Sequence, residues 1–373
     1  MDLEQKVSLK YVVIKGILLF FMINFLFVPL DPIPALGRLS AYNLIFPGRV
    51  RLPFGENPSL AYNLSMNNLE AMLASHELCD GNKPLDEYRV LLLGDSSVWG
   101  YLLEPQNTLS AYLNKANLRL DGKTVRAYNL GYPTLSLTKD LLILHAAIQY
   151  KPDLVIWMIT LESLPVTIQL DSPILQNNAE LVRNLITKFN LNLDPSDPRL
   201  FDRNILQSTL FGRRRDLADI LRLQLYGVMW ASTGIDQNYQ ADYNPPQQNL
   251  DPDETFHGLQ PPILNMQNLS IDVLQAGKQL IGDTPIIFVN EPIFISHGEN
   301  SNIRYNFFYP RWAYDQYRQI FNETCQNNGW ICLDEWNSVS SDQFTNSAIH
   351  MTPNGSQILS TELANAILAQ VNP

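Results

Sequence analysis

Charged residues and cysteines are scarce in this sequence. Charged side chains make up 17% of the 373 residues, below the roughly 25% of an ordinary soluble domain, so we expect some apolar surface to meet a membrane or a partner. Three cysteines cannot make a disulfide framework. Sparse glycine and the absence of a persistent heptad exclude collagen-like and coiled-coil folds, and 10% aromatic residues argue against disorder.

Clusters of basic residues are also lacking. The chain carries 37 acidic and 26 basic side chains, for a formal net charge of -11. A protein that binds nucleic acid must neutralise phosphates with clustered Lys and Arg, so we expect no nucleic-acid partner. The sequence has no phosphate-binding loop, no dinucleotide fingerprint and no metal-binding motif. We therefore expect neither a cofactor nor a metal.

Residues 1–30 are predicted to form a membrane anchor. An apolar run over residues 16–30 is interrupted only by Asn24, and it follows three basic residues, Lys6, Lys10 and Lys15. With the residues just before it, the run approaches the ~20 residues that cross a bilayer. Basic residues before the run and Asp31 after it favour a single-pass protein of the cell membrane, with a cytoplasmic amino terminus and its main domain outside the cytoplasm. The alternative is a signal peptide cleaved near residues 35–37.

Outside the cytoplasm disulfides are permitted. Cys325 and Cys332 flank a turn at residues 327–329, so they either pair or remain buried thiols. Cys79 would then stay free.

The remaining chain alternates apolar strands with helices. Residues 31–87 are predicted to form an extended strap, over residues 31–58, and a short helix; a domain over residues 88–373 follows. The expected strands are 88–93, 125–130, 153–159, 286–290 and 330–333, and the expected helices include 137–150, 312–327 and 356–370. Such alternation predicts an α/β fold with a parallel sheet covered on both faces.

A long insertion, residues 165–262, interrupts this alternation. Residues 216–230 have apolar positions at helical spacing, and residues 236–262 are rich in Asn, Gln, Asp and Pro. So long an insertion is uncommon in a compact domain. It is either an extra helical layer on the core, or a lid or surface for lipid or a membrane partner.

The chemistry is concentrated in Leu-Leu-Leu-Gly-Asp-Ser-Ser-Val-Trp-Gly at residues 91–100. Ser96 follows a buried strand, at the edge where parallel sheets place their active sites. His350 precedes the last helix, on a loop that can reach the same edge. A serine hydroxyl needs a neighbouring base to become nucleophilic, and histidine suits this near neutral pH. Ser96 and His350 are therefore the candidate nucleophile and base.

These residues resemble the SGNH, or GDSL, hydrolase superfamily over most of residues 88–370, the insertion excepted. The resemblance implies a three-layer α/β/α fold with a parallel, flavodoxin-like sheet. It further implies that Ser96 is the nucleophile, and that the Ser96 and Gly131 N–H groups donate to the oxyanion. His350, followed by Gly355 and a helix, matches the block that carries the base.

Two departures from the family pattern bear on efficiency. The family's third block, Gly-x-Asn-Asp, is replaced here by a stretch without Asn, so Thr160 is the substitute oxyanion donor to consider; one lost donor costs about 10²–10³ in rate. The residue three before the histidine is Ser347 rather than Asp. Asn346 and Asp342 compete to orient the imidazole, with Asp334 third. An Asp-to-Asn change in a serine triad costs about 10⁴.

Further residues are candidates for binding substrate. Glu291 follows the 286–290 strand, and Arg304, Tyr305 and Asn306 lie in the polar, aromatic segment after it. Loops beside a strand end often bind ligands, although ordinary loop packing accounts for such residues equally well.

The sequence thus predicts a serine esterase or an O-acyltransferase that acts through a Ser96 acyl-enzyme outside the cytoplasm. The expected substrate is an acylated glycan or another small ester of the cell envelope. By resemblance, a multi-pass membrane acyltransferase is a candidate partner. The alternative is a non-catalytic relative that binds a glycan or scaffolds a membrane complex. Neither the acyl group nor the acceptor follows from the sequence.

Overall fold

A six-stranded sheet forms the centre of the main domain. The structure is a computed structural model that describes residues 8–37, 39, 41–45, 69–74, 76–79, 82–233 and 244–370. The strands are β1 (Glu87–Leu93), β2 (Arg119–Leu120), β3 (Lys123–Asn129), β4 (Leu154–Ile159), β5 (Ile286–Asn290) and β6 (Ile331–Asp334). Their order is β2-β3-β1-β4-β5-β6. All pairs from β3 to β6 are parallel, and their order is the flavodoxin-like one that was expected.

The edge strand β2 is the exception to the predicted parallel sheet. It pairs antiparallel with β3, with Arg119 opposite Thr124. The two strands are joined by Asp121 and Gly122, both at positive φ, which is the backbone of a tight two-residue hairpin. This short hairpin was not predicted.

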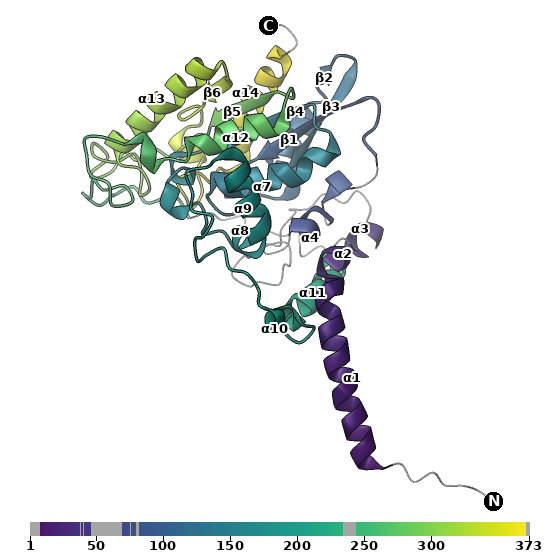
Figure 1. Cartoon of the computed structure of the whole chain (residues 1–373). Coiled ribbons are helices and arrows are strands. Elements are labelled where there is room, and N and C mark those ends of the chain that lie inside the picture. Colours follow the sequence, from purple (N-terminus) through teal and green to yellow (C-terminus); the bar gives the residue numbers. More distant parts are fainter. Residues whose placement is uncertain are drawn as a thin grey trace, which may run out of the picture.

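Helices cover both faces of the sheet, giving the three-layer α/β/α arrangement (Figure 1). On one face lie α4 (Leu69–Ala74), α7 (Leu137–Ala147), α12 (Ile271–Ile281) and α13 (Arg311–Asn328), and on the other α6 (Leu109–Lys115) and α14 (Pro353–Ala369). The central strand β1 serves both layers, because alternate side chains of a strand point to opposite faces. Leu91 and Leu93 belong to the first core, and Val90 and Leu92 to the second.

The insertion divides into two parts. Its first helices are α8 (Pro173–Asn177) and α9 (Ala179–Phe189), whose buried side chains join the α7 core, as expected for an extra helical layer. Its later helices are α10 (Ile205–Ser208) and α11 (Arg214–Thr233), which lie instead beside the amino-terminal helix (Figure 1).

The amino-terminal apolar run forms one helix, α1 (Leu9–Leu30), which projects from the α/β body (Figure 1). Within the described residues it is the one helix long and apolar enough to cross a membrane. At ~1.5 Å per residue it spans about 33 Å, close to the thickness of a bilayer's hydrocarbon core. Asn24 is its one buried residue.

The described part of the segment after α1 is helical rather than extended. It forms α2 (Ile33–Gly37) and α3 (Ala41–Ile45). The reason is packing: Ile33 and Leu36 of α2 meet Leu217 and Ile220 of α11 in a small separate core. Residues 46–58 of the predicted strap lie outside the described residues.

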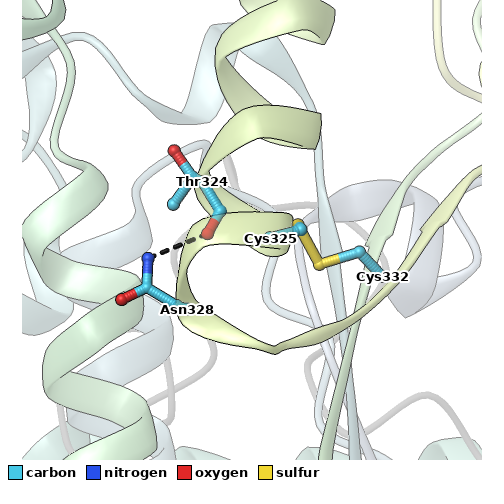
Figure 2. The surroundings of a disulfide bond; sticks show 4 residues. All are labelled: Thr324, Cys325, Asn328 and Cys332. Carbon is cyan, nitrogen blue, oxygen red and sulfur yellow. Dashed lines mark hydrogen bonds between the residues drawn. A yellow bond between two sulfur atoms is a disulfide. The ribbon is translucent and has the colours of Figure 1, made fainter.

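Cys325 and Cys332 form a disulfide, one of the two outcomes left open by the sequence (Figure 2). The bond joins the last turn of α13 to β6. Beside it, the Asn328 side chain donates a hydrogen bond to the Thr324 carbonyl oxygen at 2.8 Å. The disulfide thus closes the helix end onto the edge of the sheet.

Candidate active site

The nucleophile turn begins where β1 ends. A Cβ on Gly94 would lie 2.5 Å from the Val98 side chain, so only glycine fits the turn. Asp95 caps the following short helix, α5 (Ser96–Trp99), by accepting the Ser97 N–H at 2.8 Å. Ser96 is consequently the first residue of a helix, where backbone N–H groups have no partner within the helix.

His350 lies directly against this serine. It comes from the loop between β6 and α14, and its Nε2 is 2.7 Å from the Ser96 Oγ. The Tyr101 ring packs against the imidazole, with ring centroids 4.8 Å apart. Thr345 also fixes the loop, since its backbone N–H donates to the His350 carbonyl oxygen at 2.8 Å. The predicted nucleophile and base are therefore within hydrogen-bond reach.

The other side of the imidazole faces a neutral amide. Asn346 Oδ1 lies 3.0 Å from His350 Nδ1. Asp342 does not reach the histidine: it is exposed and accepts hydrogen bonds from Ser340 and Gln343. Asp334 is also elsewhere and pairs with Arg318 at 2.7 Å. Of the three candidates, the structure brings only Asn346 to the imidazole.

The protonation state of His350 is set by its burial without a charged partner. It lowers the pKa of His350 to about 4. The imidazole is therefore neutral and able to accept a proton near neutral pH. The imidazolium formed during reaction gains no stabilisation from a carboxylate.

Gly131 lies where the family resemblance places an oxyanion donor, but its N–H is engaged. It donates to the Asn129 side-chain oxygen at 3.0 Å. The same Asn129 amide donates to the Val98 carbonyl oxygen at 2.8 Å and so holds α5 against the end of β3. A Cβ on Gly131 would lie 2.3 Å from the Trp99 nitrogen, so this close approach requires glycine. Within this geometry the Ser96 N–H is the available donor.

Thr160 occupies the place of the missing third block. It is fully buried, and its hydroxyl lies 2.6 Å from the Tyr309 hydroxyl. Its backbone begins a short 3-10 turn closed by Ser163. These contacts commit the Thr160 hydroxyl to a neighbour in the protein.

Behind the nucleophile lies a buried cluster of three carboxyl groups, which we call the acid cluster: Asp95, Asp140 and Glu291. Glu291 accepts a hydrogen bond from Ser97, the residue after the nucleophile, and lies against Asp95. Asp140 pairs with the buried Lys139 at 2.7 Å. The cluster thus holds three carboxyl groups, and the Lys139 ammonium group interacts with two of them, Asp140 and Asp95.

The electrostatics of the acid cluster follow from this imbalance. Burial, and then the Asp95 charge, raise the pKa of Glu291 well above its usual range. Burial also raises the pKa of Asp140 to about 6, although Lys139 opposes the shift. The raised pKa means that burial favours the neutral form of Glu291, which supports the nucleophile turn through its hydrogen bond with Ser97.

The remaining candidates for substrate binding organise their own loop. The buried Arg304 donates to the carbonyl oxygens of Asn306, Phe307 and Phe308. Asn306 accepts the backbone N–H groups of two following residues, and the Tyr305 hydroxyl donates to Asp315 at 2.7 Å. The structure uses these polar groups in loop packing and does not bring them to Ser96.

Sequence reasoning missed several residues that shape the site. Asn129, Tyr101, Ser97, Lys139 and Asp140 were not proposed as site residues. The signal for Lys139 and Asp140 was present, since two adjacent charges in a largely apolar helix that packs on the sheet must be paired. Among the described residues no group of three or more His, Cys, Asp or Glu is arranged to hold a metal.

A serine hydroxyl, a neutral imidazole and a helix N-terminus meet at the carboxyl edge of a parallel sheet on a flavodoxin-like fold, which is the arrangement expected of a serine-hydrolase site. The strand order, the Gly94-Asp95-Ser96 turn and His350 before the last helix are the features that resemble the SGNH, or GDSL, hydrolase superfamily.

No protein-family model and no curated protein matches the chain. Similar solved structures include a carbohydrate acetylesterase family member from Sinorhizobium meliloti, 13% identical over 76% of this chain and 99% of that one, with a TM-score of 0.34. The native aryl esterase of M. smegmatis is 13% identical over 75% and 98%, also with a TM-score of 0.34. A family two carbohydrate esterase from Clostridium thermocellum is 10% identical over 78% and 66%, with a TM-score of 0.33. These scores are too low to bear on the activity of this chain.

Proposed function

We propose that the chain is a serine esterase or O-acyltransferase that forms an acyl-enzyme on Ser96. The observation that carries this is the line of hydrogen bonds from Ser96 Oγ to His350 Nε2, and from His350 Nδ1 to Asn346. A base within 3 Å of a serine hydroxyl, oriented by a third group, is the geometry of an activated nucleophile.

The reaction follows from the positions of these groups. His350 Nε2 takes the proton from Ser96 as Oγ attacks the ester carbonyl, and the Ser96 N–H donates to the oxyanion. The imidazolium then gives its proton to the departing alcohol, which leaves the acyl group on Oγ. A second hydroxyl, deprotonated by His350, attacks the acyl carbon, and the imidazolium returns this proton to Ser96 Oγ as the bond between Oγ and the acyl group breaks. If that hydroxyl belongs to water the product is an acid; if it belongs to a sugar, the acyl group is transferred.

We further propose that α1 is retained as a membrane anchor, with the α/β domain outside the cytoplasm. Its contacts support retention: cleavage near residues 35–37 would remove Phe27 and Ile33 from the small core that they form with Leu217 and Ile220. The three lysines at the amino terminus favour a cytoplasmic start. In this location the proposed substrate is an acylated glycan or another envelope ester, with a multi-pass membrane acyltransferase as the proposed partner.

One set of contacts favours the alternative of a non-catalytic glycan-binding or scaffolding protein. The Gly131 N–H and the Thr160 hydroxyl both have partners within the protein, and His350 has no carboxylate. Such a site would still bind an ester but would not form an acyl-enzyme. The two functions differ in whether Ser96 can be acylated.

A fluorophosphonate probe, applied to the full chain in detergent, tests this difference. We expect one labelled serine, with labelling lost in Ser96→Ala and in His350→Ala. Ser340→Ala is the matched control, because Ser340 is an exposed serine that does not contact His350; its labelling should equal that of the wild type. Absence of labelling in a folded wild-type chain would establish the non-catalytic alternative. Measuring acetate released from an acetylated glycan, with and without an unacetylated acceptor, then separates hydrolysis from transfer.

A further inference from the structure

Helix α11 presents an apolar face with no partner among the described residues. Leu217 and Ile220 pack against α2 and the end of α1. Leu221, Leu225 and Met229 follow at intervals of four residues, so they line one face of the helix, and all three are exposed. The helix therefore has an occupied apolar face and, beside it, an unoccupied one.

Helix α10 and the turn before α11 carry further exposed apolar side chains. Ile205 and Leu206 of α10 are exposed, and so is Phe211 in the turn that joins the two helices. Together with Leu221, Leu225 and Met229 these residues form what we call the apolar strip. Six large apolar side chains exposed on one segment are unusual at a water-facing surface.

The strip is held at a defined position along α1. The Phe211 N–H donates to the side-chain oxygen of Asn24 at 2.8 Å, and the Asn24 amide donates back to the Phe20 carbonyl oxygen at 2.9 Å. Arg213 lies 3.8 Å from Asp31 at the end of α1. Asn24, which interrupts the apolar run of the sequence, is thereby buried and satisfied by the turn between α10 and α11.

This position corresponds to the edge of a bilayer. Asn24 precedes Leu30, the last residue of α1, by six positions, which is about 9 Å along the helix axis. Amphipathic helices at membrane surfaces bury their apolar face ~5–10 Å into the boundary between headgroups and acyl chains. Phe211 therefore lies at the depth at which such a face contacts lipid.

The basic residues of α11 also fit contact with a lipid surface. Arg214, Arg215 and Arg222 are exposed on the helix that carries the strip. Arginine side chains reach headgroup phosphates while the apolar residues beside them contact acyl chains. The exposed side chains of α1 are also mostly apolar, so one lipid phase would cover both.

We propose that residues 205–229 form a second membrane-contacting element, which lies in the headgroup region beside α1 with its apolar strip against lipid. The inference rests on the proposed membrane anchoring of α1, and it is independent of the chemistry at Ser96. Its consequence is that the α/β domain is attached to the membrane at two neighbouring elements rather than by a single flexible stem.

Spin-label accessibility in the full chain tests this element. Single cysteines at Leu206 and Leu225, in a Cys79→Ser background that keeps the disulfide, are labelled and reconstituted into vesicles of phosphatidylcholine and phosphatidylglycerol. Collisions with oxygen, which concentrates in lipid, are compared with collisions with a water-soluble nickel chelate. We expect the oxygen-to-nickel ratio at both positions to exceed the aqueous value severalfold.

Two further labels make the outcomes distinct. Leu85→Cys is the matched control, since Leu85 is an equally apolar residue, 98% exposed, beside β1 and far along the chain from the strip. Its oxygen-to-nickel ratio should equal the value found in water. Leu18→Cys, in the middle of α1, should report hydrocarbon. If Leu206 and Leu225 behave like Leu85 while Leu18 is in lipid, the second element is refuted and the anchor stands. If Leu18 is aqueous as well, the anchor itself fails. Labels that are immobilised and reached by neither reagent would show a protein partner on the strip and would overturn the proposal.

Discussion

Replacing Asn346 by Asp should convert a neutral arrangement into a charged triad. The Asn346 oxygen lies 3.0 Å from His350 Nδ1, and a carboxylate of the same length can take its place without moving the loop. Two unit charges about 4 Å apart interact by about 1 kcal/mol in water and about 4 kcal/mol at an effective dielectric constant of ~20. The transition state contains the imidazolium, so the expected gain in turnover lies between about fivefold and about 10³.

The same substitution should move the acid limb of the pH profile. Burial lowers the pKa of His350 to about 4, so wild-type kcat/KM should rise through about pH 4 and stay flat toward neutrality. A carboxylate beside the imidazole favours its protonated form and raises the pKa of His350, by about 1–3 units for the same interaction energy. The limb should therefore appear between about pH 5 and pH 7 in Asn346→Asp.

The assay is hydrolysis of p-nitrophenyl acetate by the full chain in detergent micelles, from pH 4 to pH 9, with Ser96→Ala as the background. Asp342→Asn is the matched control, because Asp342 is exposed and does not contact His350; its rate and acid limb should equal those of the wild type. The reasoning is refuted if Asn346→Asp changes neither turnover nor the limb while His350→Ala abolishes activity. A backbone carbonyl would then be the partner of the imidazole.

Three other perturbations test the surroundings of the site. Burial and the Asp95 charge raise the pKa of Glu291, so the folded state binds this proton more tightly than the unfolded state does. The melting temperature should therefore fall as the pH rises above the pKa of Glu291 in the unfolded chain. Glu291→Gln should keep turnover and flatten that fall, whereas Glu291→Ala should lower both turnover and the melting temperature. Thr160→Val leaves the buried Tyr309 hydroxyl without its partner, so it should cost about 1–3 kcal/mol of stability. We expect kcat/KM to be unchanged. A large fall in kcat would instead make Thr160 an oxyanion donor. Alkylation under denaturing, non-reducing conditions should modify one thiol, Cys79, and all three after reduction. Breaking the Cys325–Cys332 loop should cost about 2–3 kcal/mol on the loop-entropy model, and a melting temperature insensitive to reductant would contradict that cost.

The fold was largely predictable because its strands are buried on both faces. Continuous apolar runs that end at Gly94 and Asn290 are typical of the central strands of a parallel sheet. Three features escaped prediction for physical reasons. The β2–β3 hairpin is too short to leave a periodic signal, and α2 packs against α11, which is distant in the sequence. The docking of α11 beside α1 likewise depends on contacts between distant residues, among them the hydrogen bond of Phe211 with Asn24, 187 positions apart.

Site residues could be predicted where their role depends on residue type. They could not be predicted where the role depends on the direction in which a loop places the side chain. Ser96 and His350 follow from motifs, since few other residues can act as nucleophile and base. The choice between Asn346 and Asp342 depends on which way a loop turns, and chain distance does not encode that. Arg304 looked like a ligand because it is cationic and near a strand end, yet its guanidinium satisfies carbonyl oxygens of its own loop.

The separation of the nucleophile and its base along the chain has a consequence for how activity arises during synthesis. Ser96 and His350 are 254 residues apart, and the histidine lies within the last 24 residues of the chain. Domains fold progressively from the amino terminus as they are made, so the serine emerges early and remains unreactive until the final strand and loop have been delivered and folded. A chain interrupted before residue 350 would carry α1 and the nucleophile yet lack the base. On the proposed function, the site is therefore completed only after β6 and the loop that carries His350 have folded.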